Sequence, residues 1–118
     1  MTDKTERVAD YLQHVLDAID RIGRYTAALD LAGFLADERT QDAVIRNLEV
    51  IGEACRNVER EAPEFAAAHP GLPLAAAYEM RNALAHGYFK VDLQIVWNTL
   101  TGDLPGLRTR VVEALSEA

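Results

Sequence analysis

The sequence lacks the features that mark several large classes of protein. It has a single cysteine, Cys55, so no disulfide can form within the chain, which agrees with a reducing compartment. No stretch approaches the roughly 20 consecutive apolar residues that a membrane helix needs. The opening residues Met1–Arg7 are too charged for a secretory signal. We therefore expect a cytoplasmic protein without a membrane segment.

Basic residues are also scarce. The chain has 12 lysines and arginines against 19 aspartates and glutamates, and its formal net charge is -7. Binding of nucleic acid through a broad basic surface depends on many contacts between cations and phosphates, so this composition argues against it. Any RNA must instead be held locally, by a few side chains.

The alternation of apolar and polar residues that predicts strands is missing as well, and there is neither an internal repeat nor a long linker. What is present is helical periodicity in 118 residues, of which 49% are hydrophobic. This pattern predicts an all-α protein with one domain over residues 1–118. The expected architecture is an antiparallel four-helix-type bundle with additional short helices.

The first half of the chain predicts two long helices. Apolar residues recur every three or four positions over residues 4–31 and again over residues 40–61. Gly33 and the polar residues 37–39 interrupt the pattern, and Thr40 is the expected N-cap of the second helix.

The second of these helices has a clear apolar stripe and an apolar surplus. The stripe consists of Val44, Leu48, Ile51, Cys55 and Val58. These residues lie within about 40° of one line along the helix and predict its core face. Ile45 and Val50 lie outside the stripe, which suggests a second apolar contact such as a homodimer interface.

The second half predicts shorter helices separated by turns. A short helix over residues 64–69 is followed by the helix breakers of residues 70–73. A further helix is expected over residues 73–86, and Asp92 can cap the next one. A break near residues 102–105 should precede the last amphipathic segment.

A candidate site lies at the end of the helix over residues 73–86. Asn82 and His86 are four residues apart and share a helix face, while Arg81 lies about 100° round from Asn82. Arg81 suits phosphate binding, and a histidine at a helix end suits proton transfer. The same residues could equally cap carbonyls or face solvent, so the residues alone leave both interpretations open.

Other reactive side chains are weaker candidates. No spacing typical of a metal site is present. Cys55 falls in the core stripe, and the spacing of Trp97 from Leu93 and Leu100 also indicates a core position. We expect His14 and His69 at the surface.

Several blocks of sequence together resemble the HepT branch of the HEPN family. The motif Arg-Asn-x-x-x-His-x-Tyr over residues 81–88 is followed by Val91-Asp92 and Val96-Trp97. Residues 47–54 resemble the second-helix signature of that branch, and His69-Pro70 and residues 103–105 also fit. The order and spacing of these blocks agree with the family over nearly the whole chain.

The resemblance implies an HEPN-like bundle and a metal-independent endoribonuclease that needs no cofactor. Such a protein is the toxin of a toxin–antitoxin pair and works as a homodimer, with transfer RNA as one kind of target. Its antitoxin is an MntA-like nucleotidyltransferase. The residue matching the adenylylated tyrosine of the family is Tyr88. Without the family, a tyrosine past a helix end would be expected only to pack its ring and expose its hydroxyl.

The residue types at the motif suit this chemistry. RNA carries its own nucleophile, the 2′-hydroxyl, so cleavage needs proton transfer by His86 and charge stabilisation by Arg81, with Asn82 orienting the imidazole. One histidine cannot act as acid and base in one step, and a two-fold dimer supplies a second. The expected product is a 2′,3′-cyclic phosphate.

Two residues depart from the family pattern, and two rival functions remain. Leu74 stands where the branch usually has tryptophan, and Glu79 where it usually has glycine. The charge of Glu79 would repel a phosphate or pair with Arg81. The rivals are an HEPN-like module that presents a substrate to a nucleotidyltransferase without cleaving RNA, and a helical interaction protein whose motif has decayed.

Overall fold

The computed structural model describes residues 4–85 and 92–117, with side chains described for residues 4–80 and 92–117. Within these ranges the chain is helical and contains no strand. The main elements are three single helices and one continuous rod of three helical segments. The single helices are α1 (Lys4–Thr26), α3 (Glu38–Glu61) and α5 (Leu74–Ala85). The rod consists of α6 (Leu93–Asn98), η1 (Thr99–Asp103) and α7 (Leu104–Glu117). The predicted all-α bundle is confirmed.

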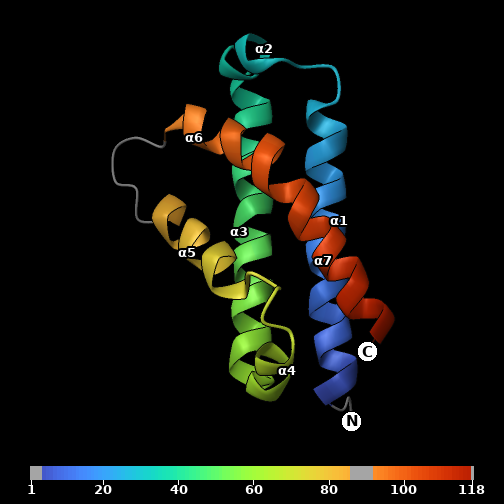
Figure 1. Ribbon diagram of the computed structural model, residues 1–118. Helices are drawn as coiled ribbons and strands as arrows, with labels where there is room; N and C mark the ends of the chain where they lie inside the picture. The colour runs from blue at the N-terminus through green and yellow to red at the C-terminus, as the bar shows by residue number, and fades with distance from the viewer. Residues whose placement is uncertain (1–3, 86–91, 118) are drawn as a thin grey trace.

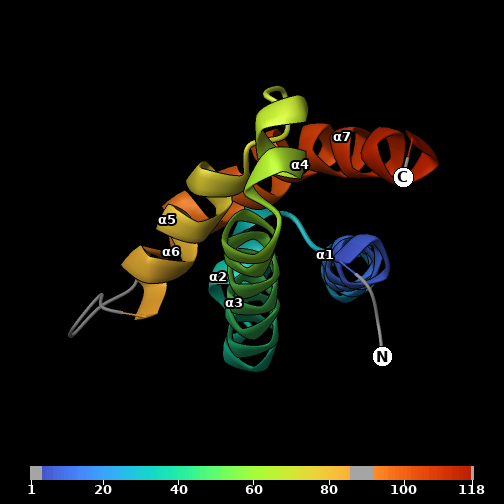
Figure 2. The same ribbon diagram turned by 90° about the horizontal axis from the view of Figure 1, so that it is seen from below.

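The helices α1 and α3 form the antiparallel central pair (Figure 1). Seen from below, α5 and α1 lie on opposite sides of α3, and α7 crosses over towards α1 (Figure 2). All five residues of the predicted stripe on α3 are buried, which confirms its core face. Burying such apolar stripes against one another is the main stabilising contribution in a bundle of this kind.

The two apolar residues of α3 that lie outside its stripe contact the core of the same chain. Ile45 and Val50 are half-buried and pack against the core cluster. Each keeps part of its apolar surface exposed, so the second contact suggested for them stays a prediction. They lie at the borders of the buried face, where a half-exposed residue still contacts its neighbours.

The first helix ends earlier than its sequence pattern predicts. It stops at Thr26, whose hydroxyl donates to the carbonyl oxygen of Ile22 at 2.8 Å. Asp30 then caps the separate short helix α2 (Leu31–Leu35) by accepting a hydrogen bond from the Gly33 amide at 2.8 Å. The helix predicted over residues 4–31 is thus wrong at its end, because an aspartate cap starts a new helix where the apolar period continues.

The N-cap of α3 is Asp37 and not Thr40. The Asp37 carboxylate accepts the Thr40 amide at 3.1 Å and the Thr40 hydroxyl at 2.8 Å. These hydrogen bonds, chiefly that from the hydroxyl, lower the pKa of Asp37. Thr40 therefore belongs to the first turn of α3, and the predicted start at residue 40 is two residues late.

The second half follows the predicted order, with one correction. The short helix α4 spans Pro63–Ala68, and Asp92 caps α6 by accepting the amides of Gln94 and Ile95 at 3.0 and 3.3 Å. The break expected near residues 102–105 is wrong, because the π-helical turn η1 leads directly into α7. Pro105 occupies the first turn of α7, and the locally wider helix accommodates it. No helix in the described ranges is long and apolar enough to cross a membrane.

The aromatic side chain of Phe34 packs α2 against Trp97 of α6. Phe34 is fully buried, and its ring centroid lies 5.3 Å from that of Trp97. Trp97 is half-buried against the core, as its spacing predicts. The short helix α2 is thereby fixed to the main bundle.

Replacing Phe34 by alanine should lower the free energy of unfolding by about 3–5 kcal/mol, because it leaves a large cavity beside Trp97. Denaturant titration followed by the fluorescence of Trp97, the only tryptophan, measures this loss. The neighbouring Leu35→Ala is the control: its side chain is 46% exposed, so its effect should stay within about 0.5 kcal/mol. Equal losses for the two variants would contradict the role given to Phe34.

Candidate functional site

The helix α5 carries the candidate motif and is fixed at its N-terminal end. Pro73 directly precedes the helix, and Leu72 and Leu74 are both buried in the core. The leucine at position 74, where the resembled branch usually has tryptophan, thus retains an apolar anchoring role. From this anchor α5 runs alongside α3 (Figure 1).

The motif lies at the far end of α5. The backbone at Arg81 and Asn82 belongs to the last turns of the helix, as predicted, but their side chains are outside the described part. His86 and Tyr88 lie outside the described residues altogether. The expected arrangement of Arg81, Asn82, His86 and Tyr88 therefore stays a prediction.

The residues just before the motif are described, and they contact α3. Tyr78 is half-buried, and the guanidinium carbon of Arg56 on α3 lies 4.9 Å from the centre of its ring. Glu79, next along α5, is exposed. The cation of Arg56 and the carboxylate of Glu79 therefore both lie at the turn of α5 that precedes the motif.

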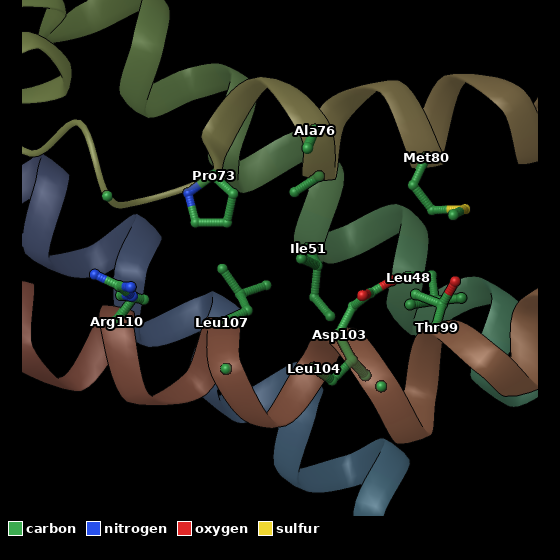
Figure 3. Close-up of a pocket in the computed structure, with 14 residues that line it drawn as sticks. Leu48, Ile51, Pro73, Ala76, Met80, Thr99, Asp103, Leu104, Leu107 and Arg110 are labelled. Carbon is green, nitrogen blue, oxygen red and sulfur yellow. The ribbon is translucent and has the colours of Figure 1, made fainter.

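A pocket lies on the face of α5 that carries Pro73, Ala76 and Met80 (Figure 3). It has a volume of about 480 Å³ and lies between α5, α3 and the η1–α7 rod. Its apolar lining includes Leu48, Ile51, Leu104 and Leu107, and Met80 contributes from α5. Position 82 lies about 200° round the helix from position 80, so the pocket opens on the face away from Asn82.

The two other histidines have different surroundings. His14 is exposed on α1, as predicted. His69 is only 22% exposed: its Nδ1 lies 3.0 Å from the Phe65 carbonyl oxygen, and its Nε2 lies 3.0 Å from a carboxylate oxygen of Glu117. Its ring also stacks on that of Phe65. His69 thus lies at the surface only in part, and its side chain joins α4 to the end of α7.

A buried amide begins the segment 47–54. Asn47 is 6% exposed; its oxygen accepts the Arg21 Nε at 2.8 Å, and its nitrogen donates to the Ala43 carbonyl oxygen at 2.9 Å. Each polar atom of the amide therefore has a partner, which offsets the cost of burying it. Asn47 links α3 to α1 and is a structural residue.

Residues 15–114 match the family described as "Ribonuclease HepT-like". The chain belongs to the HepT-like ribonuclease family. A "Probable ribonuclease HepT" of Thermococcus cleftensis is 40% identical over 84% of this chain and 87% of its own length.

Two further relatives fit the same HepT-like assignment. One, from Caldanaerobacter subterraneus, is named a "Putative RNase" and is 32% identical over 91% of this chain and 93% of its own length. Another "Putative RNase", from Methanocaldococcus jannaschii, is 30% identical over 88% of this chain and 93% of its own length. No solved structure matches the chain significantly. The resemblance inferred from the sequence blocks is confirmed.

The described part of this HepT-like chain offers neither a cluster of metal ligands nor an accessible cysteine. Within residues 4–85 and 92–117, no three histidine, cysteine, aspartate or glutamate side chains gather as a metal site would require. Cys55 is fully buried, and burial raises the pKa of its thiol to about 12. The core position predicted for Cys55 is confirmed.

Cys55 should not react with thiol reagents in the native protein. At pH 8 a pKa of about 12 leaves about one thiol in ten thousand ionised, and the buried sulfur is also shielded from the reagent. Incubation with iodoacetamide followed by mass spectrometry should show no adduct in buffer and complete reaction in denaturant. Rapid labelling of the native protein would contradict this placement.

Proposed function

We propose that this chain is a metal-independent endoribonuclease and the toxin of a toxin–antitoxin pair. The observation that carries the proposal is the HepT-like family match over residues 15–114, which includes the motif of residues 81–88. The names of the reported relatives, "Probable ribonuclease HepT" and "Putative RNase", support RNA as the substrate. Transfer RNA is one kind of RNA to be tested.

In the proposed reaction the RNA 2′-hydroxyl attacks the adjacent phosphorus. Arg81 binds the scissile phosphate and stabilises the charge that grows on its oxygens. His86 removes or supplies the proton, and Asn82 orients its ring. The products are a 2′,3′-cyclic phosphate and a free 5′-hydroxyl, so neither a metal nor a cofactor is needed for the balance of atoms.

A homodimer completes this mechanism. Each motif holds one histidine, whereas concerted cleavage needs both an acid and a base, and a two-fold axis brings a second His86 to the site. Exposed apolar side chains such as Ile95, 52% exposed, and Val112, 42% exposed, provide surface for association.

Light scattering at micromolar concentration should therefore give twice the mass of one chain. The dimer should persist in the His86→Ala variant, because this change removes a catalytic group and not apolar surface. A monomer for the parent chain would rule out the composite site.

Neutralisation is proposed to occur at Tyr88. The partner is an MntA-like nucleotidyltransferase that transfers adenylate from ATP to the tyrosine oxygen and releases pyrophosphate. The phosphodiester formed beside Arg81 and His86 would occupy the place of the RNA phosphate. The sequence distance supports this, since Tyr88 follows His86 by two residues.

The exposed carboxylate of Glu79 favours a second candidate function. It lies three residues before Asn82 and would weaken the binding of a phosphate there. A non-catalytic HEPN module that presents a substrate to the nucleotidyltransferase would tolerate such a charge.

An RNA cleavage assay separates the two functions. The purified chain should cut RNA in excess chelator, whereas a matched His86→Ala preparation should not. An adaptor would leave RNA intact in both preparations and in the presence of added metal. Cleavage that stops with chelator would instead overturn metal independence.

A further inference from the structure

The contact between Arg56 and Tyr78 joins α3 to α5, the helix whose end carries the first motif residues. Arg56 is exposed on α3, Tyr78 is half-buried on α5, and the guanidinium carbon lies 4.9 Å from the ring centre. Both helices are regular here, and they pack along each other. The aromatic ring therefore holds the cation of Arg56 at a defined place on the surface.

This place lies beside the motif and on the same side of α5. Tyr78 precedes Asn82 by four residues. In an α-helix that separation is about 40° of rotation and about 6 Å along the axis. The pocket that contains Met80 opens on the other side of the helix. A strand lying over Asn82 would thus pass Arg56 about one helical turn away.

Arg56 is exposed, so its guanidinium can bind an anion while its central carbon stays near the ring. An arginine above an aromatic ring uses the flat face of its guanidinium, while the N–H donors lie at its edge. Those donors match a phosphate and can bind it in a bidentate manner. Because the chain carries a net charge of -7, a single well-placed cation beside the motif counts for more than it would on a basic surface.

We propose that Arg56 binds a phosphate of the RNA strand next to the scissile one, and that Tyr78 is the positioning residue that holds Arg56 there. This inference rests on the proposed ribonuclease function for its substrate. Two anchored phosphates fix the direction of the strand over the motif, whereas Arg81 alone would let it rotate. The exposed Glu79 on α5 would keep the strand towards the Arg56 side by repelling phosphates from its own side.

Binding without turnover tests the inference. In the His86→Ala background, fluorescence anisotropy would measure the affinity for a labelled single-stranded RNA over a series of salt concentrations. Arg56→Gln should weaken binding about five- to tenfold, and it should reduce the slope of log K against log salt by about 0.7, the value for one single-strand phosphate contact. Arg56→Lys keeps the charge and should be intermediate.

The matched control is Arg46→Gln. Arg46 is another exposed arginine of α3, with a side chain 74% exposed, but it lines a hollow between α1 and α3 away from α5. Its loss changes the net charge equally and should leave the affinity and slope nearly unchanged. For the positioning role, Tyr78→Phe keeps the ring and should bind RNA like the parent, whereas Tyr78→Leu should bind several-fold more weakly.

Three results would overturn the inference: no RNA binding by the His86→Ala protein, equal losses for Arg56→Gln and Arg46→Gln, or a lower melting temperature for Arg56→Gln with unchanged RNA affinity. The last would make the contact purely structural. The proposed function fails separately, if the parent chain binds RNA through Arg56 but never cleaves it.

Discussion

Replacing His86 or Arg81 by alanine is expected to abolish RNA cleavage and toxicity while leaving helix content and melting temperature nearly unchanged. Loss of a general acid or base costs about 10²–10⁴ in rate, and loss of a group that stabilises the developing phosphate charge costs about 10²–10³. Initial rates on a labelled RNA, with growth of cells that express each variant, would measure both effects.

The expected stability follows from where the core lies. The buried cluster of the described residues is built on α1, α3 and the rod that ends in α7, and α5 contributes Leu74 from its first turn. The motif lies at the opposite end of α5, so its side chains should add little to the core. His14→Ala, which removes an exposed histidine of α1, is the matched control and should cleave normally. Full activity in His86→Ala would remove His86 from the mechanism.

Replacing Tyr88 by phenylalanine is expected to keep the chain toxic when the nucleotidyltransferase is supplied. Phenylalanine lacks the oxygen that accepts adenylate, so the modification cannot form. In the parent chain the adenylate adds bulk and negative charge next to Arg81, which should reduce RNA binding as well as turnover. Co-expression in cells, with mass spectrometry of the intact chain, measures both the rescue and the modification.

A second tyrosine provides the control for this experiment. Tyr25 is 42% exposed on α1, and Tyr25→Phe should still be adenylylated and neutralised. Adenylate mass on the Tyr88→Phe variant, or none on the parent chain with ATP and partner, would contradict the assignment. Neutralisation of Tyr88→Phe without added mass would show that binding of the antitoxin suffices.

Features that depend on one helix were predictable from the sequence. The stripe that includes Val44 and Val58 follows from helical periodicity, and all its members are buried. The helix ends were less predictable. Asp30 caps a new helix where the apolar pattern continues, and Asp37 is the cap of α3 in a polar segment that also offers Thr40. At Pro105 the sequence indicated a break, but a π-helical turn accommodates the proline in a continuous rod.

Features that depend on packing between distant segments could not be predicted. The ring of Phe34 is fully buried although its helix has only five residues, because α6 brings Trp97 against it. His69 is held by Glu117, which is 48 residues away in sequence. Arg56 is an exposed charged residue of α3, and only the position of α5 shows that it lies over Tyr78.

The candidate site was found through its local spacing. Arg81, Asn82, His86 and Tyr88 lie within eight consecutive residues, so the family resemblance could be recognised without any tertiary contact. The match over residues 15–114 then confirmed the family. Arg56 of α3 lies 25 or more residues before the motif and has no such local signal. Its place beside the motif could be seen only in the folded structure.

The chemical ends of the RNA fragments test the central claim most directly. Purified chain should cut RNA in excess chelator and leave 2′,3′-cyclic phosphate and 5′-hydroxyl ends, because the 2′-hydroxyl is the nucleophile. Mass spectrometry of the fragments would identify these ends, with the His86→Ala protein as the blank. Fragments with 3′-hydroxyl and 5′-phosphate ends, or cleavage equal to that of the blank, would contradict the account.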